Sequence, residues 1–171
     1  MSIYEPAGEA PVSRPAPALG PLPAFPHRAR VLIVDDIVEN RVLLGLCCDQ
    51  FGLRHESVDS GRLAVEAAQS GRFDAILMDI FMPGMDGIGA TRAILALCGP
   101  ISAPPIIAVT TAAEPGDVQR YLACGMTDVV PKPVNVARLA NALSDAFALA
   151  KRDRRTRKRK TAEQDLERMT A

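Results

Sequence analysis

The chain has 171 residues, which is enough for one ordinary domain with a hydrophobic core and additional tail segments. Hydrophobic residues make up 48% of the sequence and charged residues 23%, a balance typical of a soluble globular protein. No apolar run approaches the length of a membrane span, and the proline-rich N-terminus lacks a signal-peptide pattern. We therefore expect a cytoplasmic protein.

The formal net charge of zero conceals an uneven distribution of charged residues. Residues 28–150 carry ten basic and fourteen acidic side chains, whereas residues 151–171 carry nine basic and four acidic ones. A mildly acidic body is thus followed by a basic tail. The four cysteines (Cys47, Cys48, Cys98 and Cys124) form no C-x-x-C pair, so we expect small buried hydrophobic residues rather than zinc ligands or disulfides.

Residues 1–27 are rich in proline and alanine, with seven prolines in the segment. Such a composition buries too little apolar surface to fold, and we expect this N-terminal segment to be extended or disordered. A polyproline ligand for an aromatic groove is the functional alternative to a passive leader.

From residue 30 onward, short apolar runs alternate with segments of helical periodicity. In the first such segment Val42, Leu43, Leu46 and Cys47 recur at helical spacing, and Ser60 or Asp59 can cap the second. The predicted strands are 30–34, 55–58, 75–79, 106–109 and 128–130, and the predicted helices are 39–51, 60–69, 88–97, 117–124 and 136–150. Five alternations with short loops favour an α/β fold, a doubly wound five-stranded parallel sheet covered by helices on both faces.

Polar residues stand where the predicted strands end. The first strand is followed by Asp35 and Asp36, the third ends in Asp79, the fourth ends at Thr110, and Lys132 follows the fifth. Because the carboxyl ends of parallel strands share one edge of the sheet, we expect these residues to converge. A double aspartate alone is commonly a helix cap and a single lysine a surface charge, but their combination in this order points to a site.

The chemistry of this combination indicates phosphoryl transfer to a carboxylate. Three neighbouring carboxylates repel one another unless a cation is present, and Mg²⁺ suits their oxygen ligands. Lysine supplies a positive charge for a phosphoryl oxygen, and threonine supplies a hydroxyl for a hydrogen bond. Nucleophile, metal ligands and charge stabilisers are the parts that an in-line transfer requires.

Over residues 28–150 the chain resembles a response-regulator receiver domain, a (βα)5 flavodoxin-like fold. The motifs that carry the resemblance are VLIVDD (31–36), LMDIFMPGMDG (77–87), PIIAVT (105–110) and GMTDVVPKPV (125–134). The resemblance implies that Asp79 is the phosphoacceptor. It also implies that Asp35 and Asp36 hold Mg²⁺ together with Asp79, with the backbone carbonyl of Phe81 completing the protein ligands.

The resemblance further implies that Thr110 is the switch hydroxyl and that Lys132 pairs with the acidic cluster and later with the phosphoryl group. The family often has a cis peptide at the position of Lys132–Pro133, which an X–Pro bond tolerates at low cost. The fifth strand of the family usually carries Tyr or Phe where this sequence has Val129. Valine has no ring to rotate behind the hydroxyl, so we expect the output to depend on backbone rearrangement.

Residues 114–117, Glu-Pro-Gly-Asp, place helix breakers where the fourth helix would begin. Proline at a first helical position is ordinary, but the glycine after it favours a late or mobile start. We therefore predict a short fourth helix.

The basic run at residues 151–160 contains eight Lys or Arg residues. Three interpretations are open: a solvated extension of the last helix, a non-specific contact with nucleic acid or an anionic membrane surface, or a steering element for an acidic kinase or phosphotransfer partner. Residues 151–171 are too few to form a DNA-binding domain.

The leading functional hypothesis is a single-domain response regulator rather than an enzyme. It would accept a phosphoryl group from a sensor histidine kinase or a histidine phosphotransfer protein and signal to a protein partner or pass the group onward. The alternative is a nucleic-acid-binding regulator that acts through its basic tail. A metal-dependent phosphatase ranks last, because its acid/base carboxylate would stand two residues after Asp79, where the sequence has Phe81.

Overall fold

The structure is a computed structural model that describes residues 23–100 and 102–152. Strands and helices alternate along these residues, as the sequence predicts, and a helix over residues 136–152 closes the described chain. The labelled elements are β1 (Arg30–Val34), α1 (Val38–Gln50), β2 (Arg54–Val58), α2 (Gly61–Ala68), β3 (Ala75–Asp79), α3 (Gly87–Cys98), β4 (Ile106–Thr110), α4 (Pro115–Ala123) and β5 (Asp128–Pro131).

The five strands form one parallel sheet in the order β2-β1-β3-β4-β5. Strand β3 lies at the centre of the sheet, and every residue of β3 and of β4 is buried. Continuous apolar strands are what a parallel sheet covered on both faces requires. The predicted doubly wound fold is therefore confirmed.

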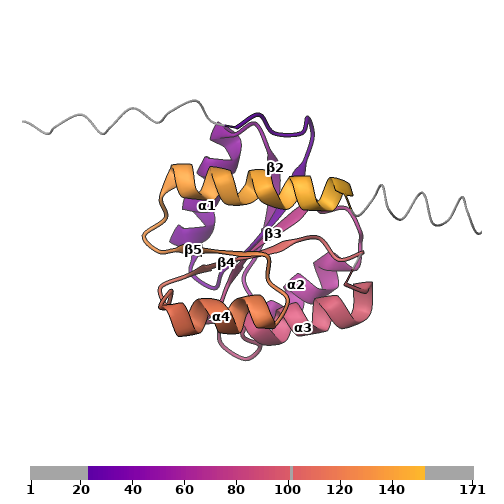
Figure 1. Ribbon diagram of the computed structural model, residues 1–171, viewed down its shortest axis with the longest axis vertical. Coiled ribbons are helices and arrows are strands. Elements are labelled where there is room, and N and C mark those ends of the chain that lie inside the picture. Colours follow the sequence, from indigo (N-terminus) through magenta and orange to yellow (C-terminus); the bar gives the residue numbers. More distant parts are fainter. Residues whose placement is uncertain (1–22, 101, 153–171) are drawn as a thin grey trace, which may run out of the picture.

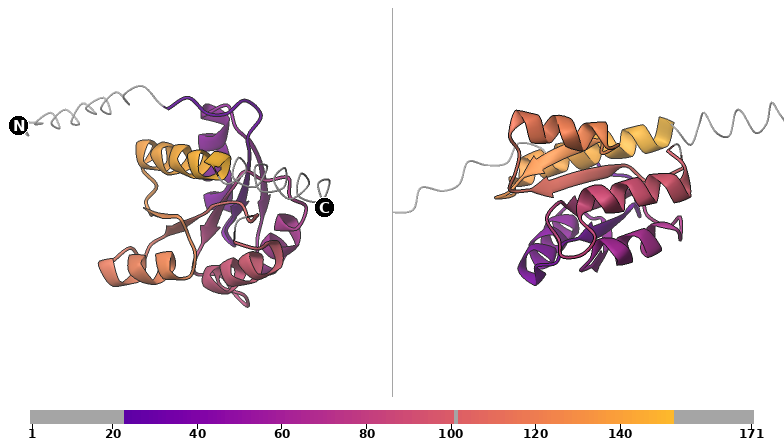
Figure 2. Two further views of the ribbon diagram at one scale, coloured as in Figure 1. Left: turned by 45° about the vertical axis from the view of Figure 1, so that its right-hand side comes forward. Right: turned by 90° about the horizontal axis from the view of Figure 1, so that it is seen from below.

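Helices cover both faces of the sheet (Figure 1). Helix α1 and the C-terminal helix (residues 136–152) pack on one face, where Leu44 and Leu143 belong to the same apolar cluster. Helices α2, α3 and α4 cover the other face, where Ala64, Ile94 and Tyr121 share a second cluster. Figure 2 shows the sheet lying between these two layers of helices.

Helix α1 forms as predicted, but it turns a different face to the sheet. Its buried residues are Leu44, Gly45, Cys47 and Cys48. Val42 and Leu46, which belong to the apolar spacing that predicts this helix, expose 57% and 61% of their surface. The reason is the close approach of β2, because a Cβ added to Gly45 would lie 2.9 Å from Cε1 of His55. Leu44 and three small residues face the sheet here, whereas Val42 and Leu46 face outward.

Two local predictions about helix starts are also corrected. Ser60 stands at the N-cap of α2, but its side chain makes no capping hydrogen bond. Helix α4 begins at Pro115 itself, so the glycine that follows does not delay its start. With nine residues, α4 is nevertheless shorter than α1 and α3, which have thirteen and twelve. The Lys132–Pro133 peptide is cis, as the resemblance implies.

The N-terminal segment meets the body at the amino edge of the sheet. The ring of Phe25 lies 5.2 Å from that of Phe51 and 6.1 Å from that of Phe147, so one aromatic group joins this segment, α1 and the C-terminal helix. Lys151 and Arg152 continue the C-terminal helix, and the remainder of the basic tail lies outside the described residues, as do residues 1–22. Among the described residues, no helix is long and apolar enough to cross a bilayer.

Candidate functional site

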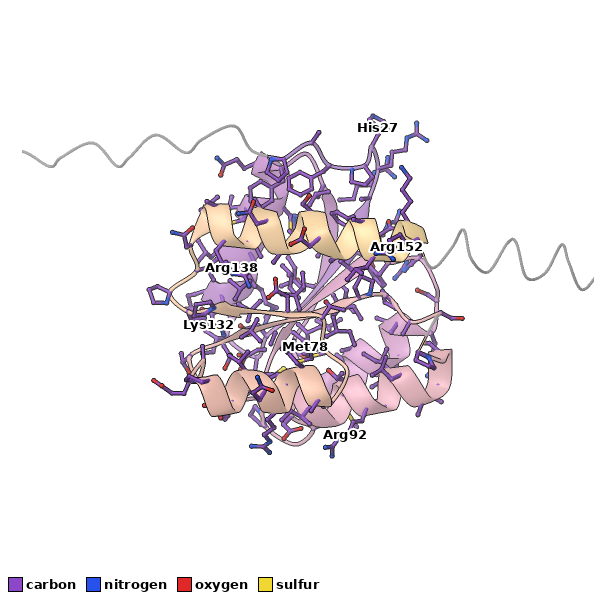
Figure 3. All side chains as sticks on the ribbon, viewed as in Figure 1. His27, Met78, Arg92, Lys132, Arg138 and Arg152 are labelled. Carbon is purple, nitrogen blue, oxygen red and sulfur yellow. The ribbon has the colours of Figure 1, made fainter. Side chains whose placement is uncertain are left out.

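The carboxyl edge of the sheet brings four of the predicted site residues together. Asp35 and Asp36 follow β1, Asp79 ends the neighbouring strand β3, and Lys132 follows β5 at the far side of β4. Figure 3 labels Lys132 at this edge. One carboxylate oxygen from each of the three aspartates lies within 4.8 Å of the other two. Residues that are nearly a hundred positions apart thus meet because the strands are parallel.

Lys132 is the cation at the centre of this cluster. Its Nζ donates a 2.7 Å hydrogen bond to Oδ2 of Asp35 and a 3.0 Å hydrogen bond to Oδ1 of Asp79. Asp35 is completely buried, and Asp79 exposes 5% of its surface. Charge-assisted hydrogen bonds of this kind are roughly twice as strong as neutral ones. A single ammonium group therefore links the ends of β1, β3 and β5.

The protonation behaviour of the cluster follows from burial and charge. Burial raises the pKa of Asp79, a hydrogen bond from Lys132 lowers it, Asp35 raises it, and the net direction is upward. Burial alone would lower the pKa of Lys132, but hydrogen bonds to Asp35 and Asp79 outweigh that effect and raise it. The lysine therefore stays charged, and the Asp79 carboxylate is held in an environment that disfavours its charge.

A second set of contacts fixes Asp35 and Asp36, and sequence reasoning missed it. Oδ1 of Asp35 accepts hydrogen bonds from the backbone N–H of Ile37 at 2.9 Å and from Nδ2 of Asn40 at 3.0 Å. Arg41 donates from one guanidinium nitrogen to the backbone oxygens of Asp35, at 2.7 Å, and Asp36, at 3.1 Å. The spacing of the sequence could have indicated these contacts. Asn40 and Arg41 come five and six residues after Asp35, so they lie on the first turns of the helix that follows the strand.

The three aspartates match the donor set that a hard divalent ion prefers. Each of them offers an anionic oxygen, and Asp36 is more exposed than the other two, which leaves one side of the cluster open to water. Mg²⁺ takes oxygen ligands and keeps several waters, so a partly open carboxylate group fits it. Asp35, Asp36 and Asp79 are therefore the residues that would hold the ion.

The backbone around Asp79 is held by a tight approach of α3. The N–H of Gly87 donates a 2.9 Å hydrogen bond to the oxygen of Ile80. A Cβ added to Gly87 would lie 2.2 Å from the backbone oxygen of Asp79, which is too close for any side chain. The glycine in the predicted motif thus allows the helix to seat against the strand end that carries Asp79.

The other predicted residues lie beside this cluster rather than in it. Thr110 is completely buried, its hydroxyl accepts a 3.2 Å hydrogen bond from the N–H of Ala112, and its backbone oxygen accepts one from the N–H of Lys132. Phe81 directs an exposed side chain away from the core, so only its backbone is suited to a ligand role. Val129 is buried in the apolar cluster on the α4 face.

Comparison with known proteins agrees with this geometry. The family model for the response regulator receiver domain matches residues 31–144. The chain is 37% identical to the sensor protein GacS of Pseudomonas syringae over 137 residues, which are 79% of this chain and 15% of GacS. The chain thus spans only a small part of the length of such curated relatives.

Solved structures show the same fold. The receiver domain of the sensor histidine kinase PA1611 from Pseudomonas aeruginosa, with magnesium in its active-site cleft, is 35% identical with a TM-score of 0.64, over 71% of this chain and 98% of that one. The receiver domain of Ssk1 from Saccharomyces cerevisiae, crystallised with the histidine phosphotransfer protein Ypd1, is 26% identical with a TM-score of 0.66, over 72% and 91%.

The chain belongs to the response regulator receiver domain family of two-component signalling proteins. Receiver domains bind Mg²⁺ in their active site, and an acidic cluster is present in this chain. The family consists of signalling proteins that pair with histidine kinases or phosphotransfer proteins, rather than of classical enzymes.

Proposed function

We propose that Asp79 accepts a phosphoryl group from a phosphohistidine donor and that the phosphorylated domain signals through protein contacts or passes the group onward. The observation that carries the proposal is the position of Lys132, which bridges Asp35 and Asp79 with one ammonium group. A cation held between a metal-binding carboxylate and a neighbouring carboxylate is suited to neutralise the charge of an arriving phosphoryl group.

The transfer follows from the chemistry of these groups. A carboxylate oxygen of Asp79 attacks phosphorus in line with the phosphorus–nitrogen bond, that bond breaks, and the imidazole of the donor keeps its electron pair. The product is an aspartyl phosphate, and Lys132 is close enough to transfer a hydrogen bond to one of the new phosphoryl oxygens. A bound Mg²⁺ supplies further positive charge to those oxygens.

The residue at position 81 supports storage of the group rather than hydrolysis of outside substrates. Turnover of such substrates calls for an acid/base carboxylate two residues after the nucleophile, and this chain has Phe81 there, with its side chain pointing outward. The aspartyl phosphate is then lost by hydrolysis or by transfer of the group to a partner protein.

The outward face of α1 is the surface we assign to the phosphohistidine donor. Ile37, Val38, Val42 and Leu46 each expose about half of their surface or more. The first two come directly after Asp36, so the apolar surface begins at the edge that carries Asp79. Apolar side chains that cluster on one helix face fit a partner helix. The complex of Ypd1 with the Ssk1 receiver supports a phosphotransfer protein as the occupant.

The acceptor assignment is tested with Asp79→Asn and the matched control Asp59→Asn. Asp59 is an exposed carboxylate after β2, at the same edge but outside the cluster. With Mg²⁺ and acetyl phosphate, the wild type and Asp59→Asn should become labelled, and Asp79→Asn should not. Label that persists on Asp79→Asn would contradict the assignment.

The docking surface is tested with Val42→Glu and the control Leu97→Glu, which changes an apolar residue of α3 that is similarly exposed. We expect Val42→Glu to slow transfer from a phosphorylated histidine phosphotransfer protein about tenfold, the effect of about 1.4 kcal/mol in an interface. Labelling by acetyl phosphate needs no docking and should stay the same. Equal slowing by Leu97→Glu would assign the effect to charge alone.

A further inference from the structure

The two edges of the sheet carry different kinds of charge. The carboxyl edge holds the three aspartates of the acceptor cluster, and further carboxylates stand at the helix starts, Glu39 on α1, Asp86 before α3 and Asp117 on α4. The amino edge holds basic residues at the starts of the strands and at the end of the C-terminal helix. We call these residues the basic edge: Arg28, Arg30, Arg54, Arg72, Lys151 and Arg152.

The basic edge is continuous across neighbouring elements. Arg54 on β2 pairs in register with Arg30 on β1, and both residues line one hollow. The backbone N–H of Arg30 donates a 2.9 Å hydrogen bond to Oδ2 of Asp74. Asp74 in turn lines a second hollow, of about 690 Å³, together with Arg28 and Lys151. The basic edge thus runs from the outer strand β2 across β1 to the C-terminal helix.

Acidic side chains neutralise only part of the basic edge. Glu56 is shared by two arginines, because its Oε1 accepts a 3.2 Å hydrogen bond from Arg30 and its Oε2 accepts a 2.7 Å hydrogen bond from Arg72. One carboxylate against two guanidinium groups leaves a net positive charge on this trio. Three further basic residues are exposed and form no ion pair with the described part of the chain: Arg28, Arg54 and Lys151.

The sequence adds positive charge at the same place. The run at residues 151–160 contains eight Lys or Arg residues and one Asp, and it begins with Lys151 and Arg152 of the basic edge. Five of the eight are arginines, and Lys151 is the one lysine of the basic edge. The planar guanidinium group donates two parallel hydrogen bonds to phosphate oxygens, which the ammonium group of lysine does not. The composition therefore fits a partner that presents phosphate groups.

The placement of the aromatic rings selects among such partners. At this edge Phe25, Phe51 and Phe147 contact one another, so their rings are used in packing. Single-stranded nucleic acids are bound by stacking of bases on available aromatic rings, and membrane-surface helices insert aromatic and aliphatic side chains. Double-stranded DNA needs neither, because its backbone presents one negative charge for every 1.7 Å or so of its length.

We propose that the basic edge, with the run that continues from it, binds the phosphate backbone of double-stranded DNA without regard to base sequence. Binding is driven by release of the cations that the phosphates hold in solution. DNA repels the carboxylates of the opposite edge, so the domain is oriented with Asp79 facing away from the duplex. The inference goes beyond the proposed phosphorylation and does not depend on it. A partner at the acceptor edge and a duplex at the basic edge can be bound at the same time.

The test uses the full chain and a fluorescently labelled DNA duplex of mixed sequence. Fluorescence anisotropy, measured between about 50 and 200 mM NaCl, gives the affinity and its dependence on salt. We expect Arg54→Gln to weaken binding about three- to tenfold and to reduce the slope of log affinity against log salt by about 0.9, the loss of one phosphate contact. A duplex of unrelated sequence should give the same values.

The matched control is Arg92→Gln, which removes the same charge from an exposed position on α3. Figure 3 shows Arg92 apart from His27 and Arg152. We expect this variant to keep the affinity and the salt slope of the wild type. A second variant, Arg154→Gln with Arg155→Gln and Arg157→Gln, neutralises part of the basic run. It should reduce the slope further, and its effect should add to that of Arg54→Gln.

Four outcomes would overturn the inference. The wild type does not bind the duplex at the lowest salt concentration, or Arg92→Gln weakens binding as much as Arg54→Gln. The triple variant abolishes binding while Arg54→Gln has no effect, which would assign binding to the basic run alone. Single-stranded DNA, or vesicles that contain phosphatidylserine, bind more tightly than the duplex. Labelling of Asp79 by acetyl phosphate is a separate measurement, so a failure of the acceptor assignment would leave this inference unchanged.

Discussion

The acceptor edge and the α4 face of this domain are held together by different forces. At the acceptor edge, Lys132 and the buried Asp35 and Asp79 meet through hydrogen bonds between charged groups. On the α4 face, Tyr121 and Val129 are placed by the packing of an apolar cluster. Charged contacts depend on pH and on added cations, whereas packed ones depend on shape. The two regions therefore respond to different perturbations.

Loss of Lys132 should give the largest effect and is confined to the first region. We expect Lys132→Met to slow labelling of Asp79 by acetyl phosphate by about 100-fold or more, the typical loss when one preorganised charge stabiliser is removed. Initial rates of labelling with saturating Mg²⁺ provide the measurement. Lys151→Met, which removes an exposed lysine from the C-terminal helix, serves as the control. A labelling rate within a factor of two of wild type would contradict this account of the acceptor edge, because phosphorylation of Asp79 would then not depend on Lys132.

Removal of Mg²⁺ should give the next largest effect. A ligand at 100 times its dissociation constant adds about 2.7 kcal/mol to the free energy of unfolding. Urea denaturation in excess Mg²⁺ and in EDTA should therefore differ by about that amount for the wild type. Asp36→Asn should lose most of the difference and Asp59→Asn should keep it. An equal response of these two variants would place the ion elsewhere.

The charge of Asp79 itself should cost stability at neutral pH. Because burial raises its pKa in the folded protein, the folded state holds this proton more tightly than the unfolded chain does. In EDTA at pH 7 we therefore expect Asp79→Asn to raise the free energy of unfolding. The gain should shrink as the pH falls through the raised pKa and disappear below about 3.8, the ordinary value. A gain that does not depend on pH would contradict this origin.

The smallest effect belongs to the second region. The hydroxyl of Thr91 on α3 is buried and has no hydrogen-bond partner among the described residues. Thr91→Val should therefore stabilise the protein by about 1 kcal/mol in urea denaturation, with phosphoryl acceptance unchanged. Thr127→Val is the opposite case, because its hydroxyl donates a 3.1 Å hydrogen bond to Ile106, and it should lose about 0.5 kcal/mol. Equal signs for the two would show that packing, and not hydrogen bonding, decides this region.

The sequence predicted those features that depend on the order of residues along the chain. Alternating apolar runs and helical segments predicted the parallel sheet, and the strand ends predicted which side chains meet at its carboxyl edge. These inferences succeed because a parallel sheet converts order along the chain into proximity at one edge. The proposed roles of Asp79 and Lys132 remain predictions that the experiments above test, and the role of Thr110 remains a prediction as well.

The parts that sequence reasoning missed depend on how close two elements come. The apolar pattern of α1 gave no sign that Gly45 would lie against His55 and so turn Val42 and Leu46 outward. Nor did the pattern of α4 reveal that Tyr121 would be its one buried residue, because the residues of a helix carry no mark of which neighbours they will contact. Such contacts are fixed by interaxial distances, and these arise only when the whole core packs.

The aromatic group around Phe25 brings residues near the two ends of the described chain together. Residues 24–29 and the end of the C-terminal helix, including Lys151, line the same hollow of about 690 Å³. Figure 3 places His27 and Arg152 on the side of the molecule away from Lys132. Residues near both ends of the described chain thus lie together, on the side of the molecule away from Lys132. A partner that contacts the acceptor edge would therefore not meet these residues.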